Sequence, residues 1–144
     1  MRIFIFLVLI STSNFASANS SVDAENEGEA VGILFGYLKE VDVYKFMCSK
    51  YAPEMKETIS RATDDWMNRN NTIVASLLSG LERTPENEVN ELLAVAQKTS
   101  RNRIILFNKL SKTEQGELCS KMVTGLTEDT VKQKYPLAIK HLSK

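Results

Sequence analysis

The chain has 144 residues, with 18 basic and 18 acidic side chains and a single histidine. Charges this evenly balanced argue against a nucleic-acid-binding protein, which needs a dense basic face, and against a strongly basic membrane-surface peptide. The length suits one domain that buries roughly two thirds of the surface of its unfolded chain.

The first eighteen residues have the features of a cleavable signal peptide. Residues 1–2 give a short positive start, residues 3–10 are an unbroken apolar run, and residues 16–18 (Ala-Ser-Ala) match a signal peptidase site. Neither this run nor any later stretch reaches the ~20 apolar residues of a spanning helix, so we expect no stable membrane insertion. We predict an exported protein with 17 basic and 18 acidic residues after cleavage. The periplasm is the favoured location and the extracellular space the alternative.

Helical patterning begins after an acidic arm. Residues 19–28 are small, polar and acidic, and we expect them to be disordered. From residue 29 onward, apolar residues recur at helical spacing, and no strand-like alternation persists. This pattern predicts a single all-α domain over residues 29–144, with no internal repeat and no linker.

The first predicted helix, at about residues 29–51, is apolar on more than one side. Two apolar stripes at different angles run through residues 31–48. A helix of this kind is buried on more than one side, so it lies either at the centre of a bundle or in a homodimer interface. Gly32 and Gly36 leave a smooth patch for another backbone, which we interpret as a packing feature.

Capping and proline signals predict four further helices, at about residues 53–81, 85–109, 111–124 and 128–144. Pro53 and Pro85 suit first helical positions, with Thr84 as an N-cap, and residues 111–114 have capping-box spacing. Gly125 is expected to end the fourth helix, and Thr127 and Pro136 to cap and then kink or divide the fifth. A short connection makes the second and third helices antiparallel, which predicts a compact four- to five-helix bundle.

The two cysteines, Cys48 and Cys119, have no competing thiol in the chain. In an exported protein this predicts a disulfide between them. The bond would tie the first helix to the fourth. A redox role is not expected, because there is no Cys-x-x-Cys spacing to lower the pKa of either thiol.

Two polar residues fall on the apolar stripes of predicted helices. With about 100° per residue, Asn70 shares a face with Trp66, and Arg103 is in line with Phe107. The structural interpretation is a buried network that fixes the register of the second and third helices, with Arg103 able to stack on Trp66. The functional interpretation is a polar binding site in a groove, for which Trp66, Arg69, Asn70 and Arg103 are the candidate residues.

Catalytic and cofactor signals are weak. His141 lies near the end of the chain, where we expect it to be exposed, and no set of residues has metal-ligand spacing. Haem ligation by His141 with Met47 or Met55 is disfavoured, since methionine at helical spacing is usually core filler. Asp64 and Asp65 point about 100° apart and cannot form a dyad. We therefore predict no catalytic residues, no metal and no cofactor.

These observations favour a non-enzymatic, exported helical binding protein that acts through a protein–protein surface, as an inhibitor, immunity-type protein, adaptor or chaperone. The alternative is a carrier that holds a small apolar ligand between helices near Trp66. A cavity lined by Met47, Met55, Trp66 and Phe107 would favour the carrier, and a filled core with a flat exposed apolar patch would favour the protein partner. A further alternative is a hydrolase, which two inward carboxylates ~5–9 Å apart across a cleft would support.

Overall fold

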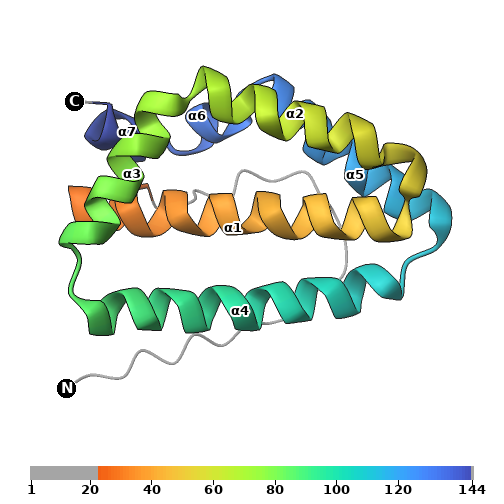
Figure 1. Cartoon of the computed structure of the whole chain (residues 1–144), viewed down its shortest axis with the longest axis horizontal. Coiled ribbons are helices and arrows are strands. Elements are labelled where there is room, and N and C mark those ends of the chain that lie inside the picture. Colours follow the sequence, from red (N-terminus) through yellow and green to blue (C-terminus); the bar gives the residue numbers. More distant parts are fainter. Residues whose placement is uncertain (1–22, 144) are drawn as a thin grey trace.

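The computed structural model describes residues 23–143. The predicted signal peptide and residues 19–22 of the predicted arm lie outside this range. Helices account for 88% of the described residues, among which no strand occurs, so the predicted all-α class is confirmed (Figure 1). No helix in this range has the length and apolar character needed to cross a membrane. The elements are α1 (Glu27–Tyr51), η1 (Pro53–Met55), α2 (Lys56–Arg69), α3 (Asn71–Arg83), α4 (Glu86–Asn108), α5 (Lys112–Thr127), α6 (Thr130–Lys134) and α7 (Pro136–Leu142).

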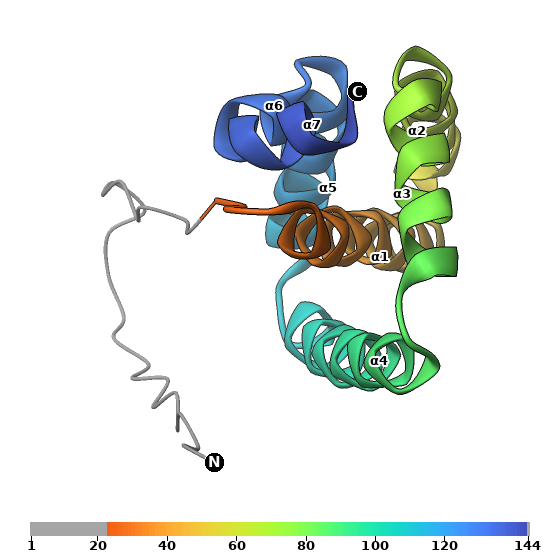
Figure 2. The same ribbon diagram turned by 90° about the vertical axis from the view of Figure 1, so that its left-hand side faces the viewer.

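Helix α1 is the central element. Helices α2, α3, α5 and α7 pack around one side of it, and α4 packs on the other side (Figure 2). Val31 of α1 meets Gly80 of α3, whereas Gly32 faces Leu92 of α4, so successive residues of α1 contact opposite layers. Of the two positions predicted for this helix, the structure shows the central one.

Helix α4 differs from its predicted packing. It runs parallel to α1 and antiparallel to α2 and α5 (Figure 1), but its principal contact is with α1 and not with α2 or α3. Phe107 is its one buried residue. Among its apolar residues, Val89, Leu92 and Ala96 are half-buried, and Leu93 is exposed. Helix α4 is therefore a separate layer with a large accessible surface.

The predicted disulfide is present. Cys48, in the last turn of α1, is bonded to Cys119 in the middle of α5, with the two Cα atoms 5.8 Å apart. Both residues are fully buried beside Met47 and Trp66, which belong to the same core. The bond fixes α5 against the central helix at the end of the bundle where α1 gives way to η1.

The predicted second helix is divided, because Asn70 interrupts it. Asn70 ends α2 and precedes α3, with φ −113° and ψ 23°. Its side-chain amide donates to the carbonyl oxygen of Trp66 over 3.0 Å. A short polar side chain that bonds to the backbone in this way competes with helix continuation. The resulting bend directs α3 onto α1 and α7.

The other helix ends agree in part with the sequence prediction. Ser111 and Glu114 form the expected capping box, and the last segment divides before Pro136 into α6 and α7. Helix α5 continues through Gly125 to end at Thr127, so the predicted end at Gly125 is wrong. Thr84 also differs from its predicted role: it follows α3, and its hydroxyl donates to the carbonyl oxygen of Gly80 over 2.9 Å.

The described end of the predicted acidic arm makes specific contacts. The carboxylate of Asp23 accepts hydrogen bonds from the backbone N–H groups of Leu137 and Ala138, over 2.7 and 3.0 Å. Ala24 is fully buried, and Asn26 caps α1, which begins at Glu27. These contacts join the start of α1 to the first turn of α7.

Candidate functional site

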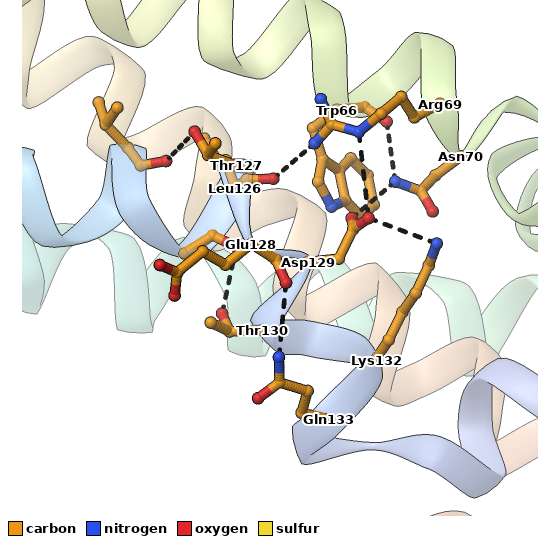
Figure 3. A network of polar contacts seen from close by, with 12 residues as sticks. Trp66, Arg69, Asn70, Leu126, Thr127, Glu128, Asp129, Thr130, Lys132 and Gln133 are labelled. Carbon is orange, nitrogen blue, oxygen red and sulfur yellow. Dashed lines mark hydrogen bonds and ion pairs between the residues drawn. The ribbon is translucent and has the colours of Figure 1, made fainter.

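The structure brings three of the four predicted site residues together at the end of α2. Trp66 and Asn70 are each only 2% exposed, whereas the side chain of Arg69 is 44% exposed. Arg69 donates from Nη2 to the carbonyl oxygen of Leu126 over 2.8 Å, and so ties α2 to the last turn of α5 (Figure 3). This cluster belongs to the α2–α5 layer.

Sequence reasoning missed Asp129, whose carboxylate completes this cluster. It accepts a hydrogen bond from Nδ2 of Asn70 over 3.0 Å, and it lies 3.5 Å from Lys132 Nζ and 4.0 Å from Arg69 Nε (Figure 3). Asp129 has φ 52°, a left-handed conformation that Asp tolerates better than most residues. Its sequence signal is its place between two helical segments, where such a turn is needed.

The cluster connects two bends of the chain. It joins the α2–α3 junction to the α5–α6 junction. The network expected from the sequence would instead have joined the second and third predicted helices. Trp66 Nε1 and Asn70 Oδ1 are buried and have no hydrogen-bond partner among the described residues. Trp66 packs against the ring of Tyr37, with the centroids 5.4 Å apart. These residues are held by packing and by internal hydrogen bonds, which suits a structural role.

Arg103, the fourth predicted residue, lies in a different part of the molecule. Its guanidinium forms an ion pair with Glu40 of α1 and lies over the ring of Tyr44, 5.9 Å from the centroid. The expected stacking on Trp66 is therefore replaced by a contact across α1 and α4.

Arg103 borders an open cavity, which we call the Tyr37 cleft. Its volume is about 670 Å³, and its walls are α1, α4, α5 and α6. Apolar side chains line much of it, among them Ile33, Leu118, Met122 and Val131. The size falls within the range of about 300–1,000 Å³ that is typical of small-molecule sites.

Two glycines of α1 keep the Tyr37 cleft open. Gly32 and Gly36 both line it, on the face that α1 turns toward α4. A Cβ atom built at Gly36 would meet no atom within 4 Å, and one built at Gly32 would meet only Leu92, at 3.8 Å. The glycine pair predicted to allow a close helix approach therefore leaves space between α1 and α4.

The polar groups of the cleft carry an excess of positive charge. Its lining includes three cationic side chains, Arg103, Lys121 and Lys134, and one carboxylate, Glu40. Burial, with the charges of Glu40 and Asp129, raises the pKa of Tyr37 to about 12. Tyr37 is therefore a neutral hydroxyl at physiological pH, able to donate a hydrogen bond to an anion.

A smaller cavity of about 140 Å³, which we call the seam cavity, lies between α1 and α4. It shares five lining residues with the Tyr37 cleft, so the two cavities adjoin. The shared residues are Gly32, Gly36, Glu40, Thr99 and Arg103. The remaining lining of the seam cavity is largely apolar and includes Phe35, Val43 and Ala96.

The arrangement offers binding groups and few groups for catalysis. Glu40 is the one carboxylate in the lining of the cleft, so the pair of facing acids that would support a hydrolase does not occur there. His141 lines a different cavity, beside α3 and α7. Residues 23–143 contain no group of three or more His, Cys, Asp or Glu that could hold a metal ion. Met47, Met55, Trp66 and Phe107, around which a cavity would have favoured the carrier, line neither the Tyr37 cleft nor the smaller cavity beside it.

Comparison with known proteins adds no assignment, since no protein-family model, no curated protein and no solved structure matches this chain.

Proposed function

We propose that this protein binds a small amphipathic anion in the Tyr37 cleft and releases it unchanged. The observation that carries the proposal is the cleft itself, a cavity of about 670 Å³ bounded by four helices and kept open by the glycines of α1. The buried core, by contrast, is filled by large side chains such as Trp66, Met47 and Ile59. The cavity that His141 lines beside α3 and α7 has a volume of about 520 Å³, but its lining is mostly polar.

The chemistry of the lining supports an amphipathic anion. Aliphatic side chains and the rings of Tyr37, Tyr44 and Tyr135 provide apolar contact. Lys121, which lines the cleft and forms no ion pair within residues 23–143, favours a negatively charged group, because an unbalanced cation in a partly enclosed site attracts anions. The proposal modifies the carrier alternative of the sequence analysis, which was a small apolar ligand held near Trp66: both the ligand chemistry and the lining residues differ.

Binding is tested with 8-anilino-1-naphthalenesulfonate, an anionic dye that fluoresces in apolar sites. Gly36→Leu places a side chain in the open space of the cleft, whereas Gly116→Leu adds the same side chain on α5, where the space is also open but outside the cleft. We expect Gly36→Leu to weaken dye binding at least tenfold and Gly116→Leu to leave it unchanged. Both variants should show the circular dichroism of the parent. Equal dye binding by the two variants would overturn the proposal.

Export is part of the proposed role, since the predicted signal peptide would place the binding activity outside the cytoplasm. Determining the N-terminal residue of the protein purified from its native source tests this. A chain starting at Asn19 supports export, and a chain that retains Met1 contradicts it.

A second candidate function is protein binding through an exposed flank of α4. Val95, which also borders the seam cavity, Ile105 and Leu106 are all more than half exposed there. The face is self-complementary: in two antiparallel copies centred on residue 100, Glu91 would lie opposite Lys109 and Val95 opposite Ile105. Such a pattern fits a two-fold symmetric contact, in which the same patch serves both partners. We therefore propose a second copy of the chain as the partner.

Sedimentation equilibrium tests this contact. We expect a concentration-dependent dimer that Leu106→Glu shifts to monomer. Leu78→Glu, at a residue of α3 with similar exposure, should leave the dimer intact. A parent protein that stays monomeric up to about 1 mM would exclude it.

A further inference from the structure

The two adjoining cavities differ in chemistry in a way that suggests the shape of the ligand. Arg103, Lys121, Lys134 and three tyrosines line the Tyr37 cleft, whereas beyond the shared residues the seam cavity is lined mostly by apolar side chains, with Lys39 and Ser100 as its polar members. A ligand that used both would have its charged group in the first and a hydrocarbon part in the second. Gly36 and Thr99 border both cavities, on α1 and α4 respectively.

The size of the seam cavity limits what can enter it. A volume of 140 Å³ holds about five groups of the size of a water molecule or a methylene, at roughly 30 Å³ each. This is room for the end of an alkyl chain and not for a fused ring system. Phe35, Val43 and Ala96 would contact such a chain.

The charged end has a suitable place at Lys121. This side chain lines the cleft and has no hydrogen bond or ion pair within residues 23–143. Arg103, by comparison, is already paired with Glu40. A single carboxylate next to Lys121 would have the neutral hydroxyl of Tyr37, in the same lining, as a further donor.

We infer, on the basis of the proposed function, that the ligand class is a single-chain alkyl carboxylate, with its carboxylate at Lys121 and its chain end in the seam cavity between α1 and α4. A bulkier amphipathic anion would occupy the Tyr37 cleft alone. The two cases differ in how affinity depends on chain length.

The first experiment measures displacement of the dye by saturated carboxylates of eight to fourteen carbons, below their micelle concentrations. Affinity should rise by about fourfold per methylene until the seam cavity is filled, as expected for transfer of methylenes out of water. Ala96→Leu, which fills the seam cavity and not the cleft, should abolish the gain from the longer chains. Ala94→Leu, an exposed position on the same helix that lines neither cavity, is the matched control.

The second experiment tests the charged end. Lys121→Gln should reduce the affinity for dodecanoate at least fivefold and leave that for dodecanol unchanged, whereas Lys98→Gln, on the exposed face of α4, should affect neither. If Gly36→Leu weakens dye binding but the carboxylates do not displace the dye, the inference is wrong and the proposed function stands. If Gly36→Leu leaves dye binding unchanged, both the inference and the proposed function are wrong.

Discussion

Asn70 donates a hydrogen bond from Nδ2 to Oδ1 of Asp129 over 3.0 Å, across 59 residues of sequence. The same nitrogen donates to the carbonyl oxygen of Trp66, so one amide serves both its own helix end and a distant loop. This pair of side chains thereby joins the α2–α3 bend to the α5–α6 bend, beside the contacts that Arg69 makes with Leu126 and Asp129. Because Asn70 is only 2% exposed, water cannot easily replace its partner.

Replacing Asp129 by Ala should lower the free energy of unfolding by about 1–3 kcal/mol, because the buried amide of Asn70 loses one of its two acceptors. Alanine must also adopt φ 52° at this position. Asp129→Gly removes the same carboxylate without that strain, so it should be about 1 kcal/mol more stable than Asp129→Ala. Urea denaturation of both variants measures the two contributions.

The control for this comparison is Asp64→Ala. Asp64 forms an exposed ion pair with Lys45 over 3.4 Å, and exposed pairs of this kind contribute less than about 1 kcal/mol. If Asp129→Ala lowers the free energy of unfolding by no more than Asp64→Ala does, the cluster does not stabilise the fold. Equal stability of the Ala and Gly variants would show that the left-handed conformation is not retained.

Local sequence signals predicted where the helices begin and end better than which helices pack together. Three predicted features depend only on residue type, or on there being no other cysteine in the chain, and all three are present. They are the capping box at Ser111, the break before Pro136 and the Cys48–Cys119 bond. The break at Asn70 was missed, since counting helical positions places this side chain on a face but does not show that it bonds back to Trp66. Local chemistry, not periodicity, ends the helix there.

The candidate site could be predicted only in part, for a related reason. A helical stripe shows that a residue faces inward, but it does not show which helix it meets. Arg103 was expected near Trp66 and instead pairs with Glu40, because α4 packs on α1 and not on α2. The Tyr37 cleft arises from the same unpredicted packing, together with the absence of a side chain at Gly36.

Removing the disulfide should strongly destabilise the protein. The bond spans a sequence separation of 71 residues, and on the chain-entropy estimate a loop of this length contributes about 4 kcal/mol. A Cys48→Ala, Cys119→Ala double variant should therefore show a markedly lower melting temperature, measured by circular dichroism. The reduced parent protein should melt close to the variant. An unchanged melting curve after verified reduction would mean that the bond is dispensable.

Alanine at the two glycines of the central interface should have opposite effects. At Gly80 an added Cβ would lie 2.5 Å from Cγ2 of Val31, which is buried and rigidly branched, so Gly80→Ala should destabilise by about 1–3 kcal/mol. At Gly36 the added Cβ meets no atom within 4 Å, so Gly36→Ala should stabilise by up to about 1 kcal/mol through helix propensity.

A Val31→Ala background checks the cause of the first effect. With the methyl groups of Val31 removed, Gly80→Ala should no longer be destabilising, because the added Cβ then fills the space that they leave. The measurement is a double-mutant cycle in urea. A loss of stability at Gly80 that is the same in both backgrounds would rule out the contact with Val31 as its origin.

Asp23 should make stability depend on pH in the acidic range. Burial favours the neutral acid, but the N–H groups of Leu137, Ala138 and Ala24 outweigh this effect and lower the pKa of Asp23 below its usual 3.8, with a smaller contribution from His141. The unfolded chain therefore binds more protons than the folded one in this range. The stabilisation is complete above about pH 3.8 and is lost as the pH falls through the folded-state pKa.

Urea unfolding of the parent and of Asp23→Asn, at intervals from pH 7 to pH 2.5, tests this dependence. The difference in unfolding free energy between the two proteins should be constant at neutral pH and shrink on acidification. Parallel curves for the two proteins would show that the ionised carboxylate of Asp23 does not hold the start of α7.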